Sequence, residues 1–204
     1  AFGPTRRCIV QMSLLSAHLL LPFLLWTAAA ARYCPEDSDC PAVGRNTLQP
    51  GGGAGSGVYT YVSHGGTPVI SSATVKFTQA DLNHGSEPTK SAHEYTASLG
   101  SDDDDAGHIF ANELGGLAVP INLFPQARHV NRGAYRSFEE KIYKCMKTGG
   151  ATSATLRWEF TYESRRDTRP SSVEYSADFD GGCSAMNQHF DNPASAPSTS
   201  ELVV

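Results

Sequence analysis

The chain has 204 residues, with 16 Lys and Arg against 21 Asp and Glu, so its formal charge is −5 with the seven histidines neutral. This length suits one globular domain. A hydrophobic content of 40% can fill a core and excludes a wholly disordered chain, and the absence of a three-residue glycine period excludes a collagen-like one. The acidic balance argues against a protein that coats nucleic acid through bulk charge alone.

The N-terminal residues have the pattern of a secretory signal. Arg6 and Arg7 precede an apolar run at residues 14–26, and small residues follow at 28–31. A run of about 13 residues is short for a membrane-spanning helix, which needs about 20. We therefore predict that residues 1–31 are a signal peptide rather than a membrane anchor. The mature protein is then expected to be secreted and extracellular, without membrane association.

Four cysteines remain after such cleavage, at Cys34, Cys40, Cys145 and Cys183. An even number in a secreted chain indicates two disulfides, and four cysteines allow three connectivities. We favour a local Cys34–Cys40 bridge and a Cys145–Cys183 bridge across the fold. None of the spacings is the Cys-x-x-Cys of zinc or redox sites.

Residues 32–57 are rich in Cys, Gly and Pro and end in the glycine run 51–57, which predicts a flexible segment. A phosphate-binding loop is the alternative for such a run, but no Gly-Lys-Ser/Thr follows it. Polar residues alternate with β-branched or aromatic residues at 58–62 and 69–78, as they do in half-buried strands. Residues 84–98 are polar and irregular.

Helical periodicity is clear in residues 131–148, where apolar side chains recur every three or four positions, at Tyr135, Phe138, Ile142, Cys145 and Met146. Asn131 suits the N-cap of this helix, and Gly149-Gly150 suits its end. Strands are predicted at 155–162 and 173–179, and a disordered tail at 192–204.

This order of elements predicts an α+β domain over residues 58–191, in which a helix packs against a mostly antiparallel sheet.

Asp102 opens the most conspicuous run of acids. A calcium loop is one interpretation, because Asp102, Asp104, Gly107 and Glu113 occupy positions 1, 3, 6 and 12 of the EF-hand pattern. Ala106 stands at position 5, where it offers no side-chain ligand, and no amphipathic helix leads into the loop. The default interpretation is a solvated acidic turn.

Four short motifs follow in order: Asp105-Ala106-Gly107-His108, the segment 109–116, Asn122-Leu123-Phe124-Pro125-Gln126, and Asn131-Arg132-Gly133-Ala134-Tyr135 running into Phe138-Glu139. Together they resemble the secreted DNA/RNA non-specific endonuclease family, of the ββα-metal (His-Me finger) class. The resemblance covers residues 58–185, where Arg169-Pro170 is similar to the family's C-terminal strands. It implies a ββα-metal finger of strand, loop and the helix 131–148.

These residue types suit phosphodiester hydrolysis, which requires an activated water, relief of the phosphate charge and a stabilised leaving oxygen. A histidine is a natural base because its pKa of about 6.5 leaves it largely neutral. A hydrated Mg²⁺ needs only one or two protein oxygens. The resemblance implies that His108 is the general base, that Asn131 binds Mg²⁺ (or Mn²⁺), and that Glu139 holds a metal-bound water.

Six basic residues stand against two acids between residues 128 and 147. Arg132 and Arg136 lie one helical turn apart and are predicted to bind substrate phosphates, a contact that carries no base identity. The alternative is a solvated helix with an Arg136–Glu140 ion pair. The resemblance adds Asn122 and Gln126 as residues that orient the histidine segment or bind substrate.

Ala106 departs from the pattern, because the best-known members of the family have Arg there, which assists phosphate binding. Lys76, Lys90 and Arg128 are candidate replacements.

The predicted function is therefore a secreted, divalent-metal-dependent endonuclease that hydrolyses both DNA and RNA. The alternative is a catalytically inactive, disulfide-bonded extracellular binding module or effector on the same fold. Ala106 favours this alternative, whereas the joint presence of His108 and Asn131 argues against it. The sequence identifies no protein partner.

Overall fold

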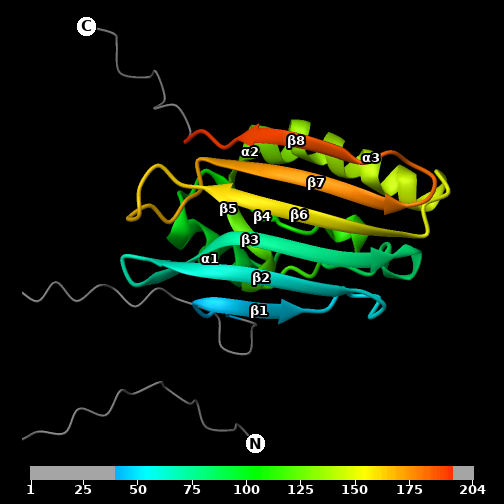
Figure 1. Cartoon of the computed structure of the whole chain (residues 1–204). Helices are drawn as coiled ribbons and strands as arrows, with labels where there is room; N and C mark the ends of the chain where they lie inside the picture. Colours follow the sequence, from blue (N-terminus) through cyan, green and yellow to red (C-terminus); the bar gives the residue numbers. More distant parts are fainter. Residues whose placement is uncertain (1–39, 195–204) are drawn as a thin grey trace, which may run out of the picture. The chain divides into compact units, whose positions relative to one another are not determined.

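The computed structural model describes residues 40–194, which form two antiparallel sheets with helices beside them (Figure 1). The larger sheet has the order β1-β2-β3-β6-β7-β8, with β1 (Gly44–Leu48), β2 (Ser56–His64), β3 (Thr67–Thr78), β6 (Ser153–Thr161), β7 (Ser172–Asp180) and β8 (Met186–Asp191). The smaller sheet pairs β4 (Asp104–His108) with β5 (Leu123–Ala127). All pairings are antiparallel, so the predicted α+β class is confirmed.

The helical elements are η1 (Gln79–Asp81), α1 (Lys90–Leu99), η2 (Asn112–Leu114), η3 (Pro120–Asn122), α2 (Arg128–Val130), the π-turn η4 (Asn131–Tyr135) and α3 (Arg136–Lys147). Of these, α1, α2 and α3 lie with the β4–β5 pair on one face of the larger sheet (Figure 1). No helix within residues 40–194 has the length and apolar composition that a membrane crossing requires.

The core lies between the larger sheet and α3. Alternation along β6 buries Leu156, Trp158 and Phe160, and the helical stripe buries Phe138 and three further predicted positions, Tyr135, Ile142 and Met146. Trp158 Nε1 donates a hydrogen bond to the Tyr135 hydroxyl at 3.0 Å. The predicted central strands and the apolar face of the helix are therefore confirmed.

A disulfide joins Cys145, near the end of α3, to Cys183 in the turn between β7 and β8. This predicted pair is confirmed. Cys40 is also disulfide-bonded. Cys34 and the predicted signal peptide lie outside the described residues.

The polar segment 84–98 was expected to be irregular, but its second half forms α1. Thr89 caps this helix by accepting a hydrogen bond from the Ala92 backbone N–H at 3.3 Å. Only a narrow face, including Ala92, Tyr95 and Leu99, is buried. The prediction was wrong because so short an apolar stripe gives little helical signal.

The segment 32–57, predicted to be flexible, contributes β1 and the start of β2. Its glycine run packs closely against the rest of the fold. Gly51 N–H donates to the Gly115 carbonyl at 2.8 Å, and a Cβ at Gly51 would lie 1.7 Å from the His84 carbonyl oxygen. The glycines therefore permit close backbone approach here.

Two boundaries also differ from the prediction. Asn131 is not an N-cap, because it has helical angles (φ −53°, ψ −51°) and follows α2. The prediction of a disordered tail from residue 192 is wrong for Asn192, which is buried and whose amide donates to the carbonyl oxygens of Pro125 and Pro170. Residues 195–204 lie outside the described part of the chain.

Candidate active site

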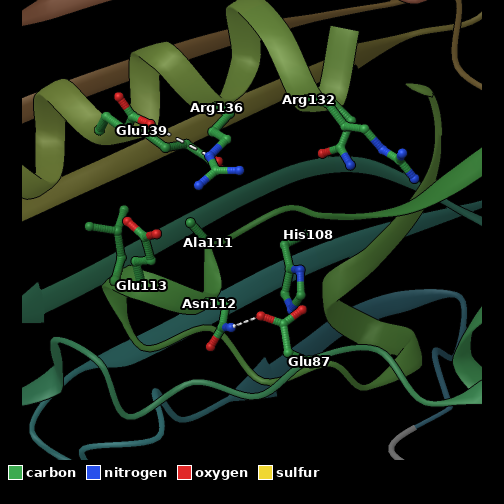
Figure 2. Close-up of a pocket in the computed structure, with 11 residues that line it drawn as sticks. Glu87, His108, Ala111, Asn112, Glu113, Arg132, Arg136 and Glu139 are labelled. Carbon is green, nitrogen blue, oxygen red and sulfur yellow. Dashed lines mark hydrogen bonds and ion pairs between the residues drawn. The ribbon is translucent and has the colours of Figure 1, made fainter. Parts of the chain in front are cut away.

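A pocket of about 220 Å³ opens between the end of β4, η2 and the helical segment η4–α3. Figure 2 shows Arg132 and Arg136 on the helical side, opposite His108 and Glu87. The lining residues include five predicted site residues, namely His108, Asn131, Arg132, Arg136 and Glu139. Residues far apart in the sequence therefore meet at one concave site.

His108 ends β4 and is half-buried, and its Nε2 lies 3.0 Å from the Ser86 carbonyl oxygen. A carbonyl only accepts, so Nε2 carries the hydrogen and Nδ1 is the basic atom of the neutral ring. Burial lowers the pKa of His108, while the Ser86 carbonyl and the Glu87 carboxylate act in the opposite direction. The net lowering keeps the imidazole neutral at neutral pH.

Asp105, which opens the histidine motif, fixes the orientation of Asn131. Its carboxylate accepts a hydrogen bond from Asn131 Nδ2 at 2.9 Å. Because the NH₂ of the amide is engaged in this way, Oδ1 is the atom available to a cation. Burial opposes ionisation of Asp105, but hydrogen bonds from Arg132 and Asn131 outweigh it and lower the pKa of this carboxyl.

The two predicted phosphate-binding arginines differ in their surroundings. Arg132 Nε and Nη2 donate to the two oxygens of Asp105 at 2.8 Å each, so much of its charge is already paired. Arg136 makes a part-exposed ion pair with Glu140, at 3.5 Å. The predicted Arg136–Glu140 contact therefore exists, and Arg136 still lines the pocket.

Glu139 lies on α3 with Oε1 buried and without a hydrogen-bond partner. Burial raises the pKa of Glu139 well above its ordinary value, and the nearby carboxylate of Glu113 adds to this effect. Both residues line the pocket. A buried carboxylate oxygen without a partner suits a cation or its bound water.

Asn122 and Gln126 are fully buried, so of the two roles predicted for them, orienting the histidine segment fits the structure and binding substrate does not. Asn122 Oδ1 accepts from the Phe110 N–H at 2.9 Å, and its Nδ2 donates to the Phe110 carbonyl oxygen at 2.9 Å. Asn122 thus holds the loop that follows His108. Gln126 packs over Gly107, where a Cβ would lie 2.4 Å from Gln126 Oε1, which explains the glycine of the motif.

Ala106 is buried beneath α1, where it packs with Ala92 and Leu123. An arginine side chain at position 106 would have to displace α1. The helix that covers this position therefore explains why the chain has alanine where the family pattern has arginine. Lys76, Lys90 and Arg128 are not among the residues that line the pocket. The cations that line it are Arg132 and Arg136.

The acidic run does not form a calcium loop. Both oxygens of Asp104 accept hydrogen bonds from Arg169, at 2.8 Å each, and the Asp104 side chain is only 1% exposed. Arg169, which the sequence associated only with the C-terminal strands, thereby anchors the start of β4.

Glu87 and Asn112 also line the pocket, and sequence reasoning missed both of them. The resemblance to the family assigned no role to either residue, and no helical or strand periodicity in the sequence connects Glu87 with His108.

A neutral histidine, a positioned carboxamide oxygen and arginines in one open pocket suit phosphodiester cleavage, so the fold and site define a nuclease. The model of the DNA/RNA non-specific endonuclease family matches residues 58–181, and the chain belongs to this family.

Among individual proteins, the chain is 36% identical over 131 residues to the probable deoxyribonuclease RhsA of Dickeya dadantii, a match that covers 64% of this chain and 9% of that protein. Two crystal structures of NucA from Streptococcus agalactiae share the fold. The metal-free form has a TM-score of 0.51 at 13% identity and covers 78% of this chain and 76% of its own. The magnesium-bound form has a TM-score of 0.52 at 13% identity and covers 79% and 77%.

Proposed function

We propose that the protein is a secreted endonuclease that hydrolyses DNA and RNA with His108 as the general base and a divalent cation at Asn131. The observation that carries the proposal is the hydrogen bond from His108 Nε2 to Ser86. It leaves Nδ1 as the proton acceptor in the same pocket as Asn131. The 13% identical NucA has been seen with magnesium bound, which makes Mg²⁺, or Mn²⁺, the expected ion.

His108 would take a proton from water through Nδ1 as the water oxygen attacks phosphorus in line with the departing 3′ oxygen. The lowered pKa of the imidazole keeps it unprotonated at neutral pH, as a base must be before it acts. The Ser86 carbonyl holds Nε2–H throughout, so the ring keeps one tautomer.

The chain's residues fit a hydrated divalent cation. Asn131 Oδ1 would bind it directly, and the partnerless Oε1 of Glu139 would hold a water of its shell. Residues 40–194 contain no cluster of three or more His, Cys, Asp or Glu side chains arranged to hold a metal ion. Mg²⁺ does not require one, because it keeps several waters. When bound, the cation supplies Lewis-acid stabilisation of the phosphate and the leaving oxygen.

Arg136 would contact a non-bridging phosphate oxygen, since its guanidinium is part-exposed and faces the pocket (Figure 2). Arg132 would act mainly by completing the Asp105 cluster. Contacts of this kind recognise the sugar-phosphate backbone and not the base, in keeping with action on both DNA and RNA.

Export is supported by the Cys145–Cys183 disulfide, because such bonds persist in oxidising compartments. The apolar run at residues 14–26 agrees with this proposal.

The test is incubation of the purified protein with plasmid and with RNA, each with Mg²⁺, with Mn²⁺ and with EDTA. We expect both substrates to be degraded with metal and neither with EDTA, and His108→Ala to lower the rate about 10²–10⁴-fold with an unchanged circular dichroism spectrum. Persistence of both substrates with either metal would refute the proposal and support the inactive binding module.

A further inference from the structure

The loop before α1 is hydrogen-bonded at Ser86 to the segment that follows η2. Its N–H donates to the Gly116 carbonyl at 3.1 Å, and its Oγ accepts from the Ala118 N–H at 2.9 Å. One residue earlier, a Cβ on Gly85 would lie 2.3 Å from the Asn112 carbonyl oxygen. The carbonyl that holds His108 Nε2 therefore belongs to a closely packed segment.

Glu87 follows Ser86 directly and lines the same pocket. Its Oε1 accepts a hydrogen bond from Asn112 Nδ2 at 2.5 Å. Figure 2 shows the carboxylate at the end of the imidazole that points away from the main chain, with the bond to Asn112 drawn beside it. The mechanism above gives this carboxylate no task.

The Glu87 carboxylate repels the phosphates of a nucleic acid that enters the pocket. A role in the reaction would explain why a carboxylate is found there. The base becomes a cation when it accepts a proton, and burial of His108 disfavours that charged form. A fixed anion beside the ring offsets this penalty, as the third member of a catalytic triad does for its histidine. The other titratable or charged groups that face this pocket are Arg132, Arg136, Glu113, Glu139 and Glu140.

We propose that Glu87 is a positioning residue for the general base: Asn112 holds its carboxylate beside His108, where its charge stabilises the imidazolium formed when Nδ1 takes the proton from water. This inference rests on the proposed function of His108. The proton stays on Nδ1 until it leaves for the departing oxygen or for solvent, and no proton passes to Glu87.

The test compares Glu87→Gln with Glu94→Gln, which removes the same charge from an exposed position on α1 that pairs with Lys90. NMR titration of the His108 ring reports the imidazole pKa without any need for activity. Steady-state kinetics on a labelled oligonucleotide report kcat and KM against pH.

For Glu87→Gln we expect the pKa of His108 to fall by about one unit. The acid limb of the rate profile should move to lower pH by the same amount. We also expect kcat to fall about tenfold and KM to stay the same or fall, because a negative charge has left the substrate's path. Glu87→Asp should restore part of both effects. Asn112→Ala should move the pKa and kcat in the same direction by a smaller amount. Glu94→Gln should match the wild type.

An unchanged His108 titration and kcat in Glu87→Gln would overturn the inference, even if the wild type cleaves and His108→Ala does not. A fall in kcat without movement of the acid limb would also overturn it, since this is the result of a merely structural role. If the wild type cleaves nothing but the His108 titration still moves in Glu87→Gln, the proposed function fails while the coupling of the two side chains stands.

Discussion

Replacing Asp105 with Asn tests whether the orientation of Asn131 governs the site. In the native protein the carboxylate accepts hydrogen bonds from Asn131 Nδ2 at 2.9 Å and from Arg132 Nε and Nη2 at 2.8 Å. The side chain of Asp105→Asn has almost the same shape, but one of its two polar atoms is itself a donor. Arg128 Nε donates to the same carboxylate at 3.4 Å, and the one remaining oxygen cannot satisfy all four donors, so at least one of Asn131, Arg128 and Arg132 loses its acceptor.

The magnitude follows from the burial of the two partners. A hydrogen bond to a charged group contributes about 1.5–3 kcal/mol when shielded from solvent, but the Arg132 side chain is 65% exposed, and exposed ion pairs contribute about 0–1 kcal/mol. We expect the free energy of unfolding to fall by about 1–2 kcal/mol. Activity should fall about 10–100-fold, the usual cost of losing the group that orients a metal ligand.

The assay measures initial cleavage rates over a range of Mg²⁺ concentrations, with Asp103→Asn as the control. Asp103 is exposed on the same acidic run, so its replacement removes one charge without touching Asn131. In Asp105→Asn the Mg²⁺ concentration for half-maximal rate should rise. A wild-type Mg²⁺ dependence in this variant would refute the view that Asp105 holds the carboxamide in place.

Three further changes have direct expectations. Because burial lowers the pKa of His108, log(kcat/KM) should be level above about pH 6.5 and decline at lower pH. The free energy of unfolding should also fall as the pH drops below that value, because the His108 imidazole takes up a proton more readily in the unfolded chain than in the folded one. Urea unfolding at several pH values checks this. Arg136→Ala should raise KM about tenfold in low salt, because it removes a charged phosphate contact. The control is Lys144→Ala, which removes an exposed cation of α3 that does not line the pocket and should leave KM almost unchanged. Replacing both Cys145 and Cys183 with Ser removes a disulfide between cysteines 38 positions apart. The free energy of unfolding in urea titrations should fall by about 3–4 kcal/mol, and activity should be retained at low temperature.

The central sheet could be predicted because its strands are buried on one face only. Leu156, Trp158 and Phe160 face the core while the residues between them face outward, and a period of two survives in the sequence. By contrast, β1 and β8 lie at the edges of the sheet, where β1 has no fully buried side chain and β8 has only Phe190. Elements that bury so little leave no clear period to detect.

The site could be predicted as a set of residues but not as a set of contacts. The motifs identified His108 and Asn131, which line one pocket. They also suggested Asn122, either to orient the histidine segment or to bind substrate, and its amide binds the Phe110 backbone in the interior. Motif order does not distinguish a residue that contacts substrate from one that holds the loop behind it. Glu87 gave no signal in the sequence, because its place in the pocket depends on how a distant loop packs.

Ala106→Arg restores the arginine of the family's best-known members and tests why this chain lacks it. Ala106 is 4% exposed and packs with Ala92 (2%) and Leu123 (1%) beneath α1. Overpacking a core costs about 1–3 kcal/mol, and a buried unpaired charge costs about 3–5 kcal/mol, so we expect the helix to be displaced.

Urea unfolding of Ala106→Arg should show a loss of at least about 3 kcal/mol, whereas Ala54→Arg, at an exposed position, should show almost none. Cleavage should weaken rather than improve, because α1 follows directly from the segment that holds His108 through Ser86. A variant as stable as the wild type that cleaves DNA faster would show that α1 does not seal this face. Ala106 would then reflect the loss of a phosphate-binding arginine rather than a requirement of core packing.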